Sequence, residues 1–129
     1  PHPGEMARLI KSTIKEVQED RIGISKSFSQ SHHVYLVLKG FRTLIATPKG
    51  EVFINPTGNP GLASGGTGDV LTGMIGGLIC QGLDILQSLQ IAVYLHGLAG
   101  DGLSQELGEK SLVATDIIKK IPALLQGRI

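Results

Sequence analysis

Eight of the eighteen glycines in this chain lie between residues 58 and 77, and this concentration constrains the fold more than any other feature. Glycine leaves the main chain uncovered and permits backbone conformations that other residues avoid. An apolar helical pattern begins directly after the densest part, at Gly68 and Asp69. The sequence therefore predicts a tight loop that leads into a buried helix, with main-chain amides free to meet a ligand. The loop is Asn59-Pro60-Gly61-Leu62-Ala63-Ser64-Gly65-Gly66-Thr67-Gly68-Asp69.

Apolar periodicity and turn residues predict helices on both sides of a short set of strands. We expect helices over residues 4–20 and 25–30, a strand over 34–38 buried on both faces, and a β-hairpin with strands 43–47 and 51–55. Later helices are expected from Gly68 to about Gln81, from Asp84 onward, and after Thr115. Pro122 kinks or ends the last helix. The helix from Asp84 contains Gly97, Ala99 and Gly100, which are small enough for close helix packing. This order indicates an α/β fold with the glycine loop beyond the strand ends, where such sheets bind ligands.

Composition excludes several classes of protein. The chain has 129 residues, 41% of them hydrophobic, and this is enough for one compact domain. Its formal net charge is +1 and its basic residues form no dense block, so we expect no nucleic-acid partner. No apolar stretch is long enough to span a membrane. The single cysteine, Cys80, is expected in the core, and a lone cysteine fits the cytoplasm.

The glycine loop and the aspartate at its end suggest phosphoryl transfer. The amides of Gly65, Gly66, Thr67 and Gly68, with the positive end of the next helix dipole, can hold a phosphate without a side-chain cation. A carboxylate beside that phosphate is repelled unless it takes a proton from the attacking hydroxyl, which is a role for Asp69. The alternative is structural: the glycines make a tight turn and Asp69 caps the helix.

Two shorter segments are further candidates for ligand binding. At the start, Pro1-His2-Pro3-Gly4-Glu5 fixes His2 between two prolines as a hydrogen-bonding group, and Glu5 could bind Mg²⁺ through water. Lys39-Gly40-Phe41-Arg42-Thr43 follows a predicted strand, and its cations and hydroxyl suit a nucleotide's phosphate and ribose. Each segment has an equally good structural explanation, the first as the entry to a helix and the second as a solvated turn.

Two histidine positions could be taken for metal ligands. His96 and Asp101 are five apart on a predicted helix and therefore share a face poorly, so structural roles are favoured. His32 and His33 lie in a polar stretch ahead of a strand, and we interpret them as solvated residues rather than a ligand pair.

The three motifs, in this order, resemble the ribokinase-like superfamily and, within it, the NAD(P)H-hydrate dehydratases. The glycine segment is similar to the signature Asn-x-Gly-x-Ala-x-Gly-Gly-Thr-Gly-Asp of that family. Residues 1–5 resemble its Pro-His-x-Gly-Glu motif and residues 39–43 its Lys-Gly-x-x-Thr segment, and residues 95–101 continue the likeness. Sugar and vitamin kinases of the superfamily have Asn where His2 stands here, so His2 favours the dehydratases.

The resemblance implies repair of hydrated NADH or NADPH, specifically the S-epimer, by phosphorylation of the ring hydroxyl and loss of phosphate. By carry-over, Asp69 would be the general base and contact that hydroxyl, and His2 would bind the hydrated dinucleotide. Lys39, Gly40, Phe41, Arg42, Thr43 and Gly68 would line the nucleotide site. ADP or ATP would be the donor, the loop favouring ADP, and Glu5 would organise Mg²⁺ through water.

The family domain is about twice as long as this chain. We therefore expect residues 1–129 to be the C-terminal half of a three-layer α/β/α domain with a mostly parallel central sheet and a β-hairpin, completed by an N-terminal half. Members are often homo-oligomers, and a fused epimerase domain is an open question. Two other functions stay open: a ribokinase-like kinase for a small alcohol such as a vitamin precursor, and a non-catalytic nucleotide-binding fragment.

Overall fold

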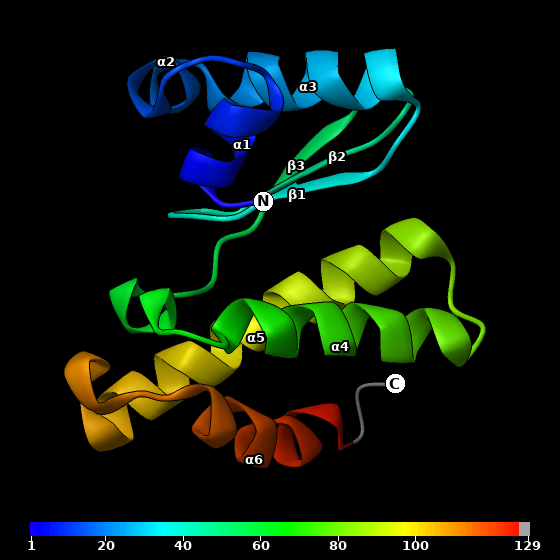
Figure 1. Ribbon diagram of the computed structural model, residues 1–129. Coiled ribbons are helices and arrows are strands. Elements are labelled where there is room, and N and C mark those ends of the chain that lie inside the picture. The colour runs from blue at the N-terminus through cyan, green and yellow to red at the C-terminus, as the bar shows by residue number, and fades with distance from the viewer. Residues whose placement is uncertain (127–129) are drawn as a thin grey trace. The chain divides into compact units, whose positions relative to one another are not determined.

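Figure 1 shows the computed structural model, which describes residues 1–126. The chain divides into two compact units, Pro1–Pro56 and Thr57–Ile129. The first unit combines helices with a small sheet, and the described part of the second is helical.

The first unit begins with three short helices, α1 (Pro3–Leu9), α2 (Ile14–Glu19) and α3 (Arg21–His32). The single helix expected over residues 4–20 is wrong. Lys11 takes a left-handed conformation (φ 54°), and the Ser12 amide donates to the carbonyl of Ala7 at 2.9 Å, which closes α1. Thr13 and Glu16 then form a capping box that starts α2.

Three strands follow, β1 (Leu36–Leu38), β2 (Leu44–Ala46) and β3 (Val52–Ile54), in the order β1-β2-β3. The expected hairpin is confirmed, with Ile45 opposite Phe53. The strand ahead of it, expected in a mostly parallel sheet, pairs antiparallel with β2, Val37 opposite Ile45. The connections at residues 39–43 and 47–51 explain this, because a parallel crossover needs a dozen or so residues.

The core of the first unit lies between its helices and one face of the sheet. Figure 1 shows α1, α2 and α3 on the same side of the strands. Met6, Ala7 and Val17 from the helices pack with Leu36, Leu38, Leu44 and Ala46 from the strands. Leu9 and Ile14 share the apolar spacing of the helix expected over residues 4–20, but they are more than half exposed because the chain turns between them.

The second unit packs three helices together, α4 (Thr67–Cys80), α5 (Ile85–Leu107) and α6 (Ala114–Leu125), with short 3₁₀ turns η1 (Pro60–Ala63) and η2 (Glu109–Ser111). The helix start predicted at Asp84 is confirmed, since Asp84 caps α5 through the amides of Leu86 and Gln87. The starts predicted at Gly68 and after Thr115 are placed slightly late, because α4 begins at Thr67 and α6 at Ala114. Pro122 lies inside α6. Ala99, Leu103, Leu112 and Ile117 form the core of this unit.

The expected burial of Cys80 is wrong, and two further details of the helices differ from the sequence pattern. Cys80 is exposed, not in the core. The buried residues of α4 include Leu71 and Leu78, one face of the helix, and Cys80 lies two residues past Leu78, roughly on the opposite face. Ile118 is 53% exposed, because its neighbour Ile117 takes the buried position in α6. Gly97 and Gly100 allow close packing, as expected, but they lie against Thr57 and Leu62, in the loop and turn ahead of α4.

No helix within residues 1–126 is long and apolar enough to cross a lipid bilayer.

Candidate functional site

His2 is the N-cap of α1. Its Nδ1 accepts hydrogen bonds from the amides of Gly4 (3.1 Å) and Glu5 (3.3 Å). A Cβ on residue 4 would lie 3.0 Å from the imidazole, so glycine at this position lets the ring fold over the helix end. Because Nδ1 accepts, Nε2 carries the ring proton of the neutral imidazole. The His2 side chain is half-exposed, and its Nε2–H donor lies 3.5 Å from Oε1 of Glu5.

Glu5 completes the first turn of α1 and faces a lysine. Its Oε2 accepts from the amide of His2 at 2.8 Å and lies 4.0 Å from Nζ of Lys39. The hydrogen bond from the His2 amide lowers the pKa of the Glu5 carboxyl, and the positive charge of Lys39 acts in the same direction. Glu5 is consequently a carboxylate at neutral pH.

The structure brings the two candidate motifs of the first unit together. The amide of Lys39, directly after β1, donates to the carbonyl of Pro1 at 2.8 Å. This bond places Lys39 next to the turn that carries His2. The segments are far apart in sequence, and their contact joins the proposed dinucleotide group to the proposed nucleotide loop.

The loop of residues 39–43 is a tight turn with an exposed tip. Gly40 has φ +138° and Arg42 φ 52°, and the hydroxyl of Thr43 donates to the carbonyl of Gly40 at 3.2 Å. The Phe41 side chain is 78% exposed, and the guanidinium of Arg42 lies 5.5 Å from its ring centroid. An aromatic face beside a cation is a surface on which a base or a phosphate can bind.

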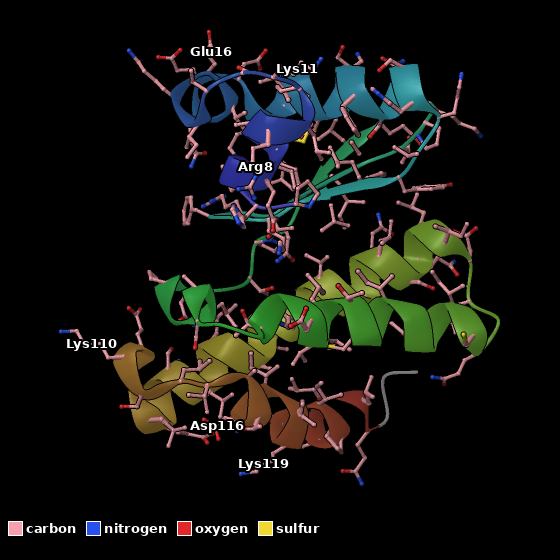
Figure 2. All side chains as sticks on the ribbon, viewed as in Figure 1. Arg8, Lys11, Glu16, Lys110, Asp116 and Lys119 are labelled. Carbon is pink, nitrogen blue, oxygen red and sulfur yellow. The ribbon has the colours of Figure 1, made fainter. Side chains whose placement is uncertain are left out.

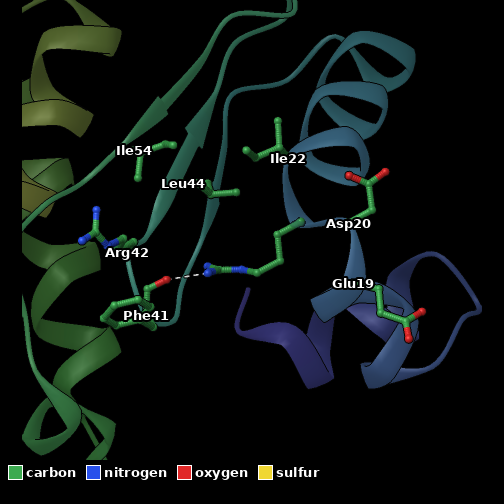
Figure 3. Close-up of a pocket in the computed structure, with 8 residues that line it drawn as sticks. Glu19, Asp20, Ile22, Phe41, Arg42, Leu44 and Ile54 are labelled. Atoms are coloured by element: carbon green, nitrogen blue, oxygen red, sulfur yellow. Dashed lines mark hydrogen bonds between the residues drawn. The ribbon is translucent and has the colours of Figure 1, made fainter.

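An open groove of about 300 Å³ borders this loop. Figure 3 shows Phe41, Arg42, Leu44 and Ile54 on the strand side. The junction of α2 and α3 contributes Glu19, Asp20, Arg21 and Ile22. The dashed line in Figure 3 marks the hydrogen bond that the carbonyl of Phe41 accepts from Arg21. Sequence reasoning missed Arg21, because a single arginine at a helix start carries no motif.

In the second unit, Asp101 of α5 holds the start of the glycine segment. Its carboxylate accepts from the amide of Gly58 at 2.9 Å and from the side-chain amide of Asn59 at 3.0 Å. Asn59 in turn accepts from the amide of Gly61 at 2.9 Å and caps η1. The structural role favoured for Asp101 is thus confirmed by these contacts.

Thr67 and His96 fix the end of the same segment. The hydroxyl of Thr67 lies within hydrogen-bond distance of the carbonyls of Leu62 (2.6 Å) and Ser64 (2.9 Å). The carbonyl of Thr67 accepts from Nε2 of buried His96 at 2.9 Å. His96 therefore supports the loop as a hydrogen-bond donor, which agrees with the structural role favoured for it.

The N-terminus of α4 leaves its main-chain donors open. Its N-cap, Gly66, has φ +85° and provides no side-chain cap. The amide of Thr67 makes a long bond of 3.4 Å to Ser64, and the amide of Val70 makes the first ordinary one, 3.1 Å to Gly66. The amides of Gly65, Gly66, Gly68 and Asp69 have no hydrogen-bond partner among residues 1–126. A phosphate oxyanion is the ligand that such a set of donors fits.

Asp69 differs from the acids at the equivalent position of other helices. Glu5, Glu16 and Asp116 each accept a hydrogen bond from the N-cap amide of their own helix. Asp69 makes no hydrogen bond or ion pair within the described chain, and it is exposed. The structural alternative, in which Asp69 caps the helix, therefore has no hydrogen bond to support it.

The described residues contain no group of three or more His, Cys, Asp or Glu side chains that could hold a metal ion. His32 ends α3 and His33 is its C-cap, both exposed, and the structure assigns no ligand role to them. His96 and Asp101 are engaged with the glycine segment instead, as described above. A Mg²⁺ ion beside Glu5 would thus take most of its ligands from water and phosphate, the way it usually binds in phosphoryl-transfer sites.

Comparison with known proteins adds an independent line of evidence. The sequence model of the family described as NAD(P)H-hydrate dehydratase matches residues 1–123. The bifunctional NAD(P)H-hydrate repair enzyme Nnr of Moorella thermoacetica is 48% identical over 127 residues, 98% of this chain and 24% of that protein. The ADP-dependent (S)-NAD(P)H-hydrate dehydratase of Bacillus subtilis is 40% identical over 122 residues, 95% of this chain and 44% of that protein. The chain spans less than half the length of these curated relatives.

Solved structures agree with the sequence comparison. The ADP/ATP-dependent NAD(P)H-hydrate dehydratase of Bacillus subtilis, co-crystallised with ATP and Mg²⁺, matches with a TM-score of 0.94 and 39% identity, over 98% of this chain and 46% of that one. A ribokinase-like superfamily protein of Enterococcus faecalis matches with a TM-score of 0.82 and 34% identity, over 98% of this chain and 42% of that one. The expected ribokinase-like α/β fold is confirmed.

Proposed function

The chain belongs to the NAD(P)H-hydrate dehydratase family, and we propose that the complete protein uses ADP or ATP to convert the S-epimer of hydrated NADH or NADPH back to the reduced dinucleotide. The proposal depends on the main-chain amides at the start of α4, which have no hydrogen-bond partner among the described residues. Asp69 lies next to them and makes no capping hydrogen bond. The names of the relatives, which describe dehydration and repair of NAD(P)H hydrates, support the same reaction.

In the proposed reaction the terminal phosphate of the nucleotide lies against the amides of Gly65, Gly66, Thr67 and Gly68. Asp69 accepts the proton of the ring hydroxyl as that oxygen bonds to phosphorus, and the bond to the departing nucleotide breaks. Donors already aimed at the developing negative charge lower the barrier, because they need no reorganisation. The phosphorylated carbon–oxygen bond then breaks, phosphate leaves with the electron pair, and a proton from the neighbouring ring carbon is lost.

The first unit would bind the two ligands. His2 offers its Nε2 donor to the hydrated dinucleotide, and Lys39, Gly40, Phe41, Arg42 and Thr43 form a nucleotide-binding loop. Gly68, in the second unit, is proposed separately as a nucleotide contact. Mg²⁺, when bound, supplies charge neutralisation of the phosphates. Glu5 is suited to hold one of its waters, because one of its oxygens is engaged by the His2 amide and direct coordination would compete with that bond.

The remaining predictions concern the whole protein. We propose that residues 1–129 form part of one longer domain, because the structural match covers 98% of this chain but only 47% of the solved Bacillus subtilis relative. Completion by an N-terminal half, a homo-oligomeric state and a cytoplasmic location stay predictions.

The test is a turnover assay with the full-length protein. Hydrated NADPH is mixed with Mg²⁺ and either ADP or ATP, and reduced nicotinamide absorbance and phosphate release are followed together. We expect both signals to rise in equal amounts and only with nucleotide present. Absence of turnover with both nucleotides would contradict the proposal, and a stable phosphorylated alcohol as product would favour a small-alcohol kinase.

A further inference from the structure

Arg21, the first residue of α3, lies against the loop of residues 39–43. Its Nη1 donates to the carbonyl of Phe41, and its Nη2 donates to the carbonyl of Leu38 at 3.3 Å. These two carbonyls stand on either side of Lys39 and Gly40. One planar guanidinium therefore fixes both ends of the turn at once, a geometry that arginine can provide and lysine cannot.

The turn is fitted closely to this side chain. A Cβ on Gly40 would lie 3.2 Å from Nη2 of Arg21, and Gly40 has φ +138°, a conformation that favours glycine. The backbone thus lies directly on the guanidinium. In the same loop, Phe41 is 78% exposed and the guanidinium of Arg42 lies 5.5 Å from its ring centroid.

The contact of Arg21 with the loop is accompanied by two unfavourable features of its guanidinium. Burial lowers the pKa of Arg21 from its ordinary value, although an arginine stays charged in proteins. Its Nε is buried and has no hydrogen-bond partner among the described residues, so one donor is left unsatisfied while the other two nitrogens serve the loop. Buried donors are rarely left without partners, and such an exception calls for an explanation.

We propose that Arg21 is a positioning residue for nucleotide binding: by holding the carbonyls of Leu38 and Phe41 it presents Lys39, Phe41 and Arg42 to the nucleotide in a fixed arrangement. This inference rests on the proposed function, since it takes the loop to be part of the nucleotide site. Arg21 itself touches no ligand in this account.

The experiment compares three variants of the full-length protein, Arg21→Gln, Arg21→Lys and Arg8→Gln. Arg8 is an exposed arginine of α1 that makes no side-chain hydrogen bond or ion pair in the described chain, and it serves as the matched control (Figure 2). The dissociation constants of ADP and ATP are measured directly, and KM for nucleotide, KM for the hydrated dinucleotide and kcat are obtained from turnover.

We expect about tenfold weaker nucleotide binding and a similar rise in nucleotide KM for both Arg21 variants. The value of kcat, the KM for the hydrate and all constants of Arg8→Gln should stay within about twofold of wild type. Wild-type nucleotide binding in Arg21→Gln would overturn the proposal. Full recovery in Arg21→Lys would also overturn it, because charge alone would then suffice.

A second measurement does not depend on nucleotide. Trypsin cleaves after Arg42 at a rate that reports the order of the loop, and cleavage after Lys15, an exposed residue of α2, gives the internal reference. We expect cleavage after Arg42 to be several-fold faster in Arg21→Gln than in wild type. Equal rates would overturn the positioning role. If the wild-type protein binds neither nucleotide, the proposed function fails, and this measurement alone decides the role of Arg21.

Discussion

His2 and Glu5 hold each other across the first turn of α1. The amide of His2 donates to the Glu5 carboxylate at 2.8 Å, and the amide of Glu5 donates to Nδ1 of His2 at 3.3 Å. The imidazole has two different nitrogens, since Nδ1 caps the helix while Nε2, on the half-exposed side chain, lies 3.5 Å from Oε1 of Glu5.

The substitution His2→Asn separates the roles of these two nitrogens. Asparagine is among the best N-cap residues, so the free energy of unfolding of the full-length protein should change by less than about 0.5 kcal/mol. The Nε2 donor is lost, and we expect KM for the hydrated dinucleotide to rise about tenfold with nucleotide binding unchanged. His32→Asn, at an exposed position, is the matched control. An unchanged KM would show that His2 is only a cap.

Gly97 of α5 is predicted to be intolerant of a side chain. A Cβ there would lie 2.2 Å from Oγ1 of Thr57 and 2.8 Å from its backbone carbonyl carbon, so the loop that leads to the glycine segment must move. We expect Gly97→Ala to destabilise the protein by about 1–3 kcal/mol in denaturant unfolding. Gly102→Ala in the same helix meets the flexible end of the Lys120 side chain, with Cε at 3.5 Å and Nζ at 4.0 Å, and should be neutral or stabilising. Similar losses in both would contradict the close approach at Gly97.

Glu16 gives a prediction about pH. Its Oε2 accepts from the hydroxyl of Ser12 and from the amide and hydroxyl of Thr13, and these bonds, that of Ser12 first, lower its pKa from the ordinary 4.5. A depressed carboxyl pKa stabilises the fold above pH 4.5 and loses that effect as pH falls through the lower, folded value. Glu16→Gln should therefore be less stable than wild type at pH 7 and equal to it at strongly acidic pH.

The check is the difference in unfolding free energy between wild type and Glu16→Gln, followed from pH 7 downward. Glu19→Gln removes only an exposed contact with Lys15 and should differ little from wild type at any pH. If the difference in unfolding free energy between wild type and Glu16→Gln increased as the pH fell, the prediction would be wrong.

The parts of the fold that the sequence predicts are those determined by residues close together in the chain. The glycine loop and the helices after Gly66 and Asp84 follow from residues a few positions apart, and the hairpin follows from the Pro48 to Gly50 turn. The break between α1 and α2 was missed because Leu9, Ile10, Ile14 and Val17 keep an apolar helical spacing across it. Thr13 and Glu16 form a capping box that indicates a helix start, but the apolar periodicity gives no sign of it.

The residues that hold the site loops in place are distant from those loops in the sequence. Arg21 holds a loop seventeen or more residues away, and Asp101 and His96 hold the glycine segment from across the second unit. Such contacts depend on tertiary packing, and single residues at these positions carry no motif. The antiparallel pairing of β1 was likewise decided by the length of a connection rather than by the apolar run of the strand.

The central claim is that Asp69 removes the proton from the acceptor alcohol beside a phosphate held by main-chain amides. Asp69→Asn keeps size and polarity at an exposed position without partners, so stability and nucleotide affinity should stay close to wild type. Asp116→Asn changes the same helical position of α6, where the side chain accepts a bond from the Val113 amide and asparagine can still accept it.

The decisive measurement is therefore kcat for nucleotide-dependent dehydration by the full-length wild type, Asp69→Asn and Asp116→Asn. The account predicts a fall of about 10²–10⁴-fold for Asp69→Asn at unchanged nucleotide affinity, and no comparable fall for Asp116→Asn. Wild-type turnover by Asp69→Asn would contradict it.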